Sequence, residues 1–165
     1  MPQTRRATDD DFDAIWPIFH EIVKRGDTYA YPPDTDRARG YKFWMEKPLA
    51  TYVAVLDGQI VGTYYMKPNQ PGLGDHVCNV GYMVGSQARG RGVARAMCEH
   101  SQIEARKLGF RAMQFNLVVS TNEIAVRLWQ KMGYSIVGTL PQAFRHQELG
   151  YVDALVMYKL LIDTA

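Results

Sequence analysis

The spacing of apolar residues changes along the chain, and the first clear period is helical. Ile15, Phe19, Ile22 and Val23 recur three or four positions apart, so they share one face of an amphipathic helix. Gly26 follows this run and can adopt the left-handed conformation that ends a helix. The pattern predicts a helix that ends before this glycine, then a turn-rich loop, and then a short helix up to about residue 46.

The period then changes to the alternation that is typical of strands. The stretch TYVAVLDGQIVGTYYMK contains two β-branched and aromatic runs around Asp57-Gly58, which predicts a β-hairpin. Further strands are predicted at residues 2–7, 76–84, 111–119, 135–140 and 151–160, and further helices at 93–108 and 120–134. Ser120 and Glu123 have the spacing of a capping box at the start of the last helix.

The order of these elements, β-α-α-β-β-β-α-β-α-β-β, is typical of an α/β protein. It predicts one mixed, mostly antiparallel sheet of seven strands. The helix predicted at 93–108 joins two strands and should form a central βαβ crossover. Helices are expected on both faces of the sheet.

Composition and charge narrow the class of protein. A chain of 165 residues with 47% apolar and 22% charged residues is expected to form a single domain, residues 1–165. Its formal net charge of +2 argues against a nucleic-acid or membrane partner. Cys78 and Cys98 stand far apart without paired histidines, so no metal site is expected. Because no signal-peptide pattern is present, the chain is expected to be cytoplasmic.

Candidate chemistry is concentrated in VGSQARGRGVARAM, which begins at residue 84, between a predicted strand and a predicted helix. The stretch matches neither the dinucleotide-binding fingerprint nor the Walker A loop. The pattern that remains is Q-x-x-G-x-G, starting at Gln87.

The position of this loop suits an anion. The first N–H groups of a helix lack intrahelical partners and carry partial positive charge. Gly90 and Gly92 let the backbone approach a diphosphate closely, and Arg89 and Arg91 add charge. We therefore interpret the loop as a phosphate-binding site; the alternative is a surface turn with solvated arginines.

Two motifs resemble those of the GCN5-related N-acetyltransferase (GNAT) family. The pattern Q-x-x-G-x-G is similar to the family's acetyl-CoA loop, Arg/Gln-x-x-Gly-x-Gly/Ala. The pattern N-x-x-A-x-x-L-W-x-x-x-G-Y, which begins at Asn122, resembles the family's second cofactor helix, Asn-x-x-Ala-x-x-Leu-Tyr-x-x-x-Gly-Phe. The order of the predicted elements also resembles the family's order over almost the whole chain.

The resemblance implies the GNAT fold and acetyl-CoA as the co-substrate. In this family the strand before the loop separates from its parallel neighbour, and pantetheine lies along its exposed backbone. The diphosphate lies on the loop, and the second cofactor helix flanks pantetheine and the thioester. The cofactor-binding residues that the resemblance implies are Met83, Val84, Gln87, Ala88, Arg89, Gly90, Arg91, Gly92, Val93, Ala94, Asn122 and Trp129.

Two departures from the family pattern concern the acid and the base of acetyl transfer. Many members have Tyr where this chain has Trp129, and an indole N–H is no practical acid for a thiolate. Many members also have Glu where Asn79 aligns, and Asn cannot act as a general base. Either the base lies elsewhere, or the reaction needs only orientation and a water relay.

Asn79 and Asn116 are the candidate catalytic residues, because they lie on the strands on either side of the crossover helix. Asn is uncommon in strands, and a half-buried amide needs hydrogen-bond partners. Two interpretations stay open: the amides bridge the strands, or they hold a carboxylate or carbonyl of the substrate. The stretch FNLVVSTN resembles the branch of the family that acetylates small, amino-acid-like amines.

The favoured function is an acetyl-CoA-dependent N-acetyltransferase that acts on a small, amino-acid-like amine. The alternatives are a protein or peptide N-terminal acetyltransferase, which needs an open groove, and a non-catalytic CoA-binding module. Tyrosines that can close a small pocket are Tyr29, Tyr31, Tyr64, Tyr65 and Tyr82. Arg145, expected between the last two strands, is a candidate contact for an acidic substrate. Dimers are common where this fold occurs, so a homodimer is a further hypothesis.

Overall fold

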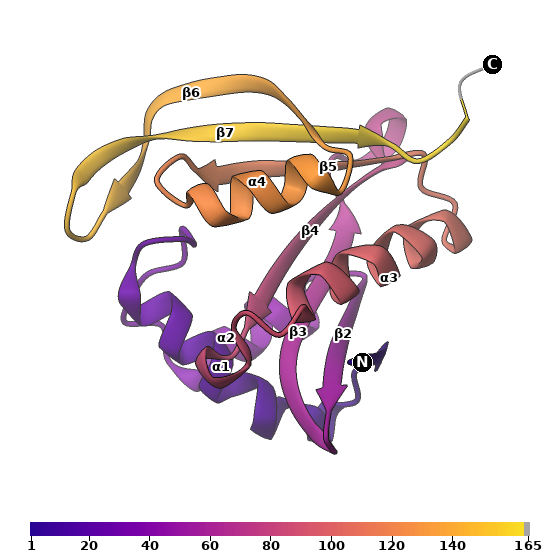
Figure 1. Cartoon of the computed structure of the whole chain (residues 1–165), viewed down its shortest axis with the longest axis vertical. Coiled ribbons are helices and arrows are strands. Elements are labelled where there is room, and N and C mark those ends of the chain that lie inside the picture. Colours follow the sequence, from indigo (N-terminus) through magenta and orange to yellow (C-terminus); the bar gives the residue numbers. More distant parts are fainter. Residues whose placement is uncertain (164–165) are drawn as a thin grey trace.

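One sheet of seven strands runs through the molecule in the order β1-β2-β3-β4-β5-β7-β6 (Figure 1). The structure is a computed structural model and describes residues 1–163. The strands are β1 (Gln3–Arg6), β2 (Ala50–Leu56), β3 (Gln59–Pro68), β4 (Val77–Val84), β5 (Ala112–Val119), β6 (Ser135–His146) and β7 (Gly150–Leu160). The α-helices are α1 (Phe12–Arg25), α2 (Arg37–Tyr41), α3 (Val93–Lys107) and α4 (Glu123–Lys131). A π-helical turn, Lys42–Glu46, follows α2.

The predicted order and type of these elements are confirmed. Only the β4–β5 pair is parallel among the pairings of the described sheet, and α3 connects these two strands. The predicted hairpin turn is also confirmed, because Asp57 and Gly58 have φ of 52° and 77°, which suits a type I′ turn. Within residues 1–163, no helix combines the length and the apolar character that crossing a bilayer requires.

β4 and β5 pair over only a short part of their length. The parallel register runs from Val77 opposite Ala112 to Asn79 opposite Gln114. Beyond this point the strands run apart (Figure 1), whereas β4 stays paired with β3 as far as Val84. Residues 80–84 of β4 therefore present an edge that β5 does not cover.

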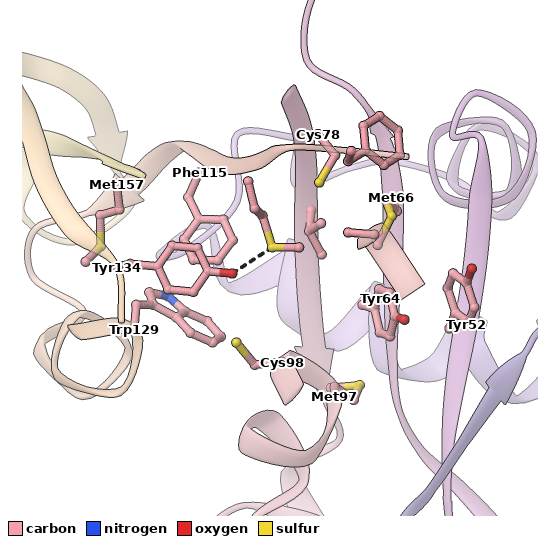
Figure 2. Packing of buried hydrophobic residues seen from close by; sticks show 14 of the residues in the cluster. Tyr52, Tyr64, Met66, Cys78, Met97, Cys98, Phe115, Trp129, Tyr134 and Met157 are labelled. Atoms are coloured by element: carbon pink, nitrogen blue, oxygen red, sulfur yellow. Dashed lines mark hydrogen bonds between the residues drawn. The ribbon is translucent and has the colours of Figure 1, made fainter. Parts of the chain in front are cut away.

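Two hydrophobic clusters cover the two faces of the sheet. On one face, α1 and the π-helical turn bury Phe19 and Trp44 against the strands. On the other face, α3 and α4 bury Met97 and Trp129 (Figure 2). The expectation of helices on both faces is confirmed, and the site described below lies where the sheet opens between them.

The predicted start of α4 is wrong. Its N-cap is Asn122, whose side-chain Oδ1 accepts from the Ala125 N–H at 3.4 Å. Ser120 and Glu123 therefore do not form a capping box. Asn is as good an N-cap as Ser, and the sequence places both within three positions, so spacing alone could not choose between them.

The predicted end of β6 is also wrong, because the strand continues beyond residue 140 to His146. A bulge between Leu140 and Phe144 interrupts its pairing with β7, and Gln142 there has φ of 53°. A proline at 141 and a broken alternation are typical of a strand end, but an edge strand tolerates both. Arg145 therefore lies within β6, opposite Tyr151, and not in a connecting loop.

Candidate active site

A cavity of about 1130 Å³ opens where β4 and β5 diverge. Its walls come from β4, the end of β5, the loop after α1, the first turns of α4 and the tip of the β6–β7 hairpin. We call the part at residues 84–94 and 121–129 the glycine end. The part at residues 25–31 and 146–149 is the hairpin end, and the point where β4–β5 pairing stops is the apex.

The glycine end is built from backbone. Gly90 and Gly92 have φ of 75° and 77°, in the left-handed region that other residues avoid. Gly92 is the N-cap of α3, and within residues 1–163 its N–H and those of Val93 and Ala94 have no hydrogen-bond acceptor. Unpaired N–H groups at a helix start, together with the helix dipole, form an anion-binding position.

Space and charge at this end both suit a phosphate. A Cβ added to Gly90 or Gly92 would meet no heavy atom within 4 Å, so open space adjoins the backbone. Arg91 forms an ion pair with Asp57 of the β2–β3 turn at 3.3 Å. Arg89 lines the cavity and forms no ion pair within the part of the chain that the structure describes, so its guanidinium is the freer of the two.

The predicted cofactor residues divide into two groups. Those that line the cavity are Met83, Val84, Arg89, Ala94, Asn122 and Trp129. Those in the adjoining loop and first turn of α3 are Gln87, Ala88, Gly90, Arg91, Gly92 and Val93. The side chains of Ala88 and Val93 are buried in the core, so only their backbone can serve a ligand.

Aromatic rings form the wall beside α4. The Trp129 ring lies 5.0 Å from the Tyr82 ring and 5.2 Å from the Phe115 ring, measured between centroids. Tyr134 does not replace the missing acid, because its side chain is buried and its hydroxyl bonds Met113 Sδ (Figure 2). Burial also raises the pKa of Tyr134 strongly.

Asn79 lies at the apex and bridges three strands. Its side chain is 6% exposed, and its Oδ1 accepts from the Tyr65 hydroxyl at 2.9 Å. Its Nδ2 donates to the Gln114 carbonyl at 3.0 Å, where backbone pairing with β5 stops. Burial raises the pKa of Tyr65 to about 12, which keeps this donor neutral. The bonds favour the bridging interpretation for Asn79.

Asn116 has a different environment, two positions beyond Gln114 on β5. Its side chain is exposed and lines the cavity. Its Nδ2 donates to Asn69 Oδ1 at 2.7 Å, and its Oδ1 accepts from Gln114 Nε2 at 3.0 Å. The two strands are neighbours as predicted, but Asn79 and Asn116 are linked through Gln114 and not to each other. Because Asn116 is exposed and its partners Asn69 and Gln114 are only half-buried, a substrate group can replace these bonds.

Tyrosines line the middle of the cavity. Tyr29 donates its hydroxyl to the Tyr82 carbonyl at 2.6 Å, on the stretch of β4 that β5 leaves uncovered, and Tyr31 stacks on Tyr29. A Cβ added to Gly81 would lie 2.6 Å from the Tyr65 ring and 3.2 Å from the Tyr29 hydroxyl. Glycine is needed there so that these rings can approach β4. Tyr64, which the sequence also suggested, is fully buried in the core instead.

Two segments far apart in the sequence meet at the hairpin end. The Gln147 N–H donates to the Gly26 carbonyl at 3.1 Å. Gly26 has φ of 63°, and a Cβ there would lie 2.1 Å from Gln147 Cγ. This contact joins the loop after α1 to the tip of the β6–β7 hairpin.

His146 contributes a donor to the cavity wall. Its Nδ1 accepts from the N–H groups of Glu148 and Leu149 at 3.1 and 3.2 Å. A nitrogen that accepts from two donors carries no proton, so the proton of the neutral ring is on Nε2. Nδ1 is therefore already occupied by these two backbone groups.

Sequence reasoning missed several residues of this wall. Lys67 lies opposite Asn79 in the β3–β4 register and lines the cavity, with its Nζ 5.3 Å from the centre of the Tyr65 ring. Its alternation with Tyr65 along the hairpin was a usable signal, because lysine is uncommon on a covered face. Arg25, Asp27 and the hairpin tip carried no such signal, since only the fold brings them together.

A family model for the acetyltransferase (GNAT) family matches residues 15–134. The chain belongs to this family. The matched range includes the glycine loop and all of α4, so the resemblance drawn from these two motifs is confirmed.

Relatives cover the chain to different extents. The N-acetyltransferase aca1 of Schizosaccharomyces pombe is 36% identical over 100 residues, which are 59% of this chain and 47% of that protein. The chain thus matches about half the length of aca1. The L-amino acid N-acetyltransferase AaaT of Escherichia coli is 29% identical over 158 residues, 94% of this chain and 96% of that protein.

Solved structures share the fold over the whole chain. A GCN5-related N-acetyltransferase from Kribbella flavida is 47% identical with a TM-score of 0.91, covering 96% of this chain and 97% of that one. The yncA protein from Salmonella typhimurium, solved with its cofactor acetyl-CoA, has a TM-score of 0.86 at 20% identity, covering 100% and 96%. The second likeness concerns the fold alone.

Proposed function

We propose that this protein is an N-acetyltransferase that moves an acetyl group from acetyl-CoA to the amine of a small, amino-acid-like substrate. The observation that carries the proposal is one cavity that joins the glycine end, with its N–H groups at the start of α3, to the hairpin end along an uncovered strand edge. Membership of the acetyltransferase family supports the reaction. The printed name of AaaT, an L-amino acid N-acetyltransferase, supports the class of acceptor.

The residues at the glycine end fit acetyl-CoA. The unpaired N–H groups at Gly92 and Val93 would hold the diphosphate with Arg89, in the open space beside the loop. The backbone of Val84, on the edge that β5 leaves uncovered, would pair with pantetheine as an added strand does, whereas the N–H and C=O of Met83 point to Thr63 of β3. Acetyl-CoA supplies the acetyl group as an activated thioester.

The apex would hold the carboxylate of the acceptor. Lys67 is half-buried and forms no ion pair within residues 1–163, so its ammonium is available. Asn116 lines the same cavity and offers an amide N–H₂. In this proposal Asn116 touches the substrate, while Asn79 keeps Tyr65 and β5 in place.

Proton removal from the amine requires an acceptor, because the pKa of an alkylammonium is about 10. Asn79 cannot take the proton, and the Nδ1 of His146 is already used by two N–H groups. The carboxylates of the described cavity wall are Asp27 and Glu148, both at the hairpin end. The proton would leave through water towards that end, while orientation of the amine supplies much of the rate enhancement.

The hairpin end separates this proposal from the second candidate, a peptide N-terminal acetyltransferase. A peptide needs an open groove, and the contact between Gly26 and Gln147 crosses that end. The second candidate keeps support from a ribosomal-protein-alanine N-acetyltransferase of Brucella melitensis. That protein has 25% identity and a TM-score of 0.84, covering 96% of this chain and 99% of that one.

Thiol release from acetyl-CoA tests the proposal with three kinds of acceptor: L-amino acids, short peptides with a free N-terminus, and buffer alone. We expect kcat/KM for the best amino acid to exceed that for the best peptide by at least about 10-fold. The reverse order would support the peptide candidate. Binding of acetyl-CoA without turnover on either class would identify a non-catalytic module.

A further inference from the structure

The edge of β4 that β5 leaves uncovered offers the backbone groups of alternate residues only. The Gly85 N–H donates to the Val61 carbonyl of β3 at 2.8 Å, so the backbone of Gly85 points to β3. Because backbone groups alternate along a strand, those of Tyr82 and Val84 point to the uncovered side. Within residues 81–84, a ligand that pairs with this edge as an added strand does can use only Tyr82 and Val84.

Tyr29, from the loop after α1, already occupies one of these two positions. Its hydroxyl donates to the Tyr82 carbonyl at 2.6 Å. Burial raises the pKa of Tyr29, so the hydroxyl stays protonated and remains a donor. A Cβ added to the neighbouring Gly81 would lie 3.2 Å from this hydroxyl, which leaves no room for a carbon atom between Tyr29 and the strand. An extended chain that runs from Val84 along this edge therefore meets Tyr29 at Tyr82.

Aromatic rings bound the same space on the side of α4. The rings of Tyr82, Phe115 and Trp129 pack against one another, with centroids 5.0 to 5.9 Å apart. Figure 2 shows Phe115 and Trp129 side by side. At the apex, the bond from Asn79 Nδ2 to the Gln114 carbonyl joins β4 to β5. We call the space between the diverging strands the β4 slot; the cavity residues that form its walls are Tyr29, Tyr82, Phe115 and Trp129.

The length of the free edge suits a short acyl chain. Val84 and Tyr82 are two residues apart on an extended strand, which corresponds to about 7 Å. From a pantetheine amide nitrogen paired at Val84, the acetyl methyl is about five bonds away, which is roughly 6–7 Å in an extended chain. The two extra methylenes of a butyryl group would add about 2.5 Å and extend past Tyr82 into the Tyr29 side chain.

Resting on the proposed function, we propose that Tyr29 limits the acyl group of the donor to the size of acetyl. The acetyl methyl ends against the Tyr29 hydroxyl and the rings of the β4 slot. A longer chain must either displace Tyr29 from the Tyr82 carbonyl or move the thioester out of its place. Both changes weaken binding and slow transfer, so Tyr29 is a specificity-determining residue for the donor and takes no part in proton transfer.

Three donors test the wild-type protein: acetyl-CoA, propionyl-CoA and butyryl-CoA. Calorimetry without an acceptor should give a Kd for butyryl-CoA at least about 10-fold above that for acetyl-CoA, with propionyl-CoA between them. With the best amino acid as acceptor, kcat/KM for butyryl-CoA should be lower than that for acetyl-CoA by about 100-fold or more. Equal values for acetyl-CoA and butyryl-CoA would overturn the role of Tyr29 and leave N-acyl transfer intact.

Variants at Tyr29 separate its ring from its hydroxyl. Tyr29→Leu removes both and should raise the butyryl-to-acetyl ratio of kcat/KM, and the same ratio of binding constants, by about 10-fold or more. Tyr29→Phe keeps the ring, so only the propionyl-to-acetyl ratio should rise, by about 2- to 5-fold. Tyr41→Leu is the matched control, because Tyr41 is a half-buried tyrosine outside the cavity whose hydroxyl bonds Asp9 at 2.9 Å. Its ratios should equal those of wild type.

The outcomes separate this inference from the proposed function. Unchanged ratios in a folded Tyr29→Leu protein would show that another residue limits the chain and would overturn the proposal. An equal rise in Tyr41→Leu would indicate general loosening and would overturn it as well. If Tyr29→Leu does not fold, Tyr29→Phe decides, and an unchanged propionyl-to-acetyl ratio is the contrary result. Failure of every donor to acylate any amino acid or peptide would overturn the proposed function, while the calorimetric series still tests Tyr29.

Discussion

The glycine end and the hairpin end of the cavity are built by opposite means. At the glycine end the wall presents backbone N–H groups, and the space beside Gly90 and Gly92 is open. At the hairpin end the wall is made of side chains, and the space beside Gly26 is already filled by Gln147. One end has open space beside main-chain groups, whereas the other is lined by side chains and crossed by a contact between two distant segments.

This difference matches the ligands that each end would receive. Every acetyl-CoA carries the same diphosphate, and a main-chain cradle needs only glycines and a helix start to bind it. Acceptors differ between enzymes of one fold, and side chains on loops can change without disturbing the sheet. The fold therefore separates a constant half of the reaction from a variable half.

The largest expected effect is a loss of acetyl-CoA affinity at the glycine end. Gly92→Asp adds a negative charge at the N-cap of α3 and a side chain at φ of 77°. We expect the Kd for acetyl-CoA to rise by at least about 100-fold, because like charge in a phosphate site costs several kcal/mol. Calorimetric titration with acetyl-CoA measures this Kd. Unchanged affinity would show that the diphosphate does not lie on this loop.

Gly109→Asp is the matched control for backbone strain. Gly109 follows α3, has φ of 87°, and a Cβ there would also meet nothing within 4 Å. The two variants should lose comparable stability, about 1–3 kcal/mol. Only Gly92→Asp should lose affinity for acetyl-CoA, so a shared loss would point to strain and not to the anion site.

The same contrast explains what could be predicted from the sequence. The glycine end was predictable because its residues are consecutive and each has a local physical requirement, as at Gly90 and Gly92. The hairpin end was not, because Gly26 and Gln147 meet only after the whole sheet has formed. Tyr29, Tyr31 and Tyr65 were proposed as pocket residues, but the way their rings lie beside β4 follows from tertiary packing.

The second prediction crowds the acceptor side of the cavity. Gly81→Ala would place a Cβ 2.6 Å from the Tyr65 ring, which must then shift with Asn79. We expect kcat/KM for the amine to fall by about 10- to 100-fold, since misplacing the acceptor by about 1 Å is costly. The Kd for acetyl-CoA should change less. Steady-state kinetics at saturating acetyl-CoA and a separate cofactor titration distinguish the two effects.

Gly62→Ala is the control on the opposite face. Its Cβ would lie 2.9 Å from Val93 and 3.0 Å from Met97, both on α3. The added Cβ is as crowded as in Gly81→Ala, but its neighbours belong to α3, which begins at the glycine end. If Gly62→Ala lowers amine kcat/KM as much as Gly81→Ala does, the two ends of the cavity are not separable in the way proposed.

The third prediction distinguishes the role of Asn79 from that of Asn116. Asn79→Ala removes a buried bridge and should lower the free energy of unfolding by about 1–3 kcal/mol. Asn116→Ala affects exposed bonds, so its melting temperature should stay near that of wild type, while amine kcat/KM falls by about 5- to 30-fold. Thermal unfolding and kinetics on both variants measure this. Normal amine kinetics in Asn116→Ala would remove this residue from the substrate site.

The fold itself was predictable where periodicity was long and turns had strong residue preferences. The β2–β3 hairpin and the end of α1 at Gly26 follow from such signals. Two predictions were wrong. The start of α4 was misplaced because Ser and Asn are similarly good N-caps, and β6 was predicted too short because a bulge breaks its alternation. Pairing with β7 decides where β6 ends, and this pairing cannot be read from the sequence of β6 alone.

The smallest expected effect is at Trp129, the last residue of the glycine end. Trp129→Phe keeps an aromatic ring beside Tyr82 and Phe115, and the indole N–H it removes is no practical acid. We expect kcat to fall by less than about 10-fold, with similar small changes in cofactor Kd and amine KM. Trp129→Tyr is the matched variant, because it differs from Trp129→Phe only by a hydroxyl. If Trp129→Phe loses the roughly 10²–10⁴-fold typical of general acid–base groups, this position takes part in proton transfer after all. If instead Trp129→Tyr exceeds Trp129→Phe in kcat without a change in Kd, the hydroxyl protonates the thiolate, and the wild-type chain works without that acid.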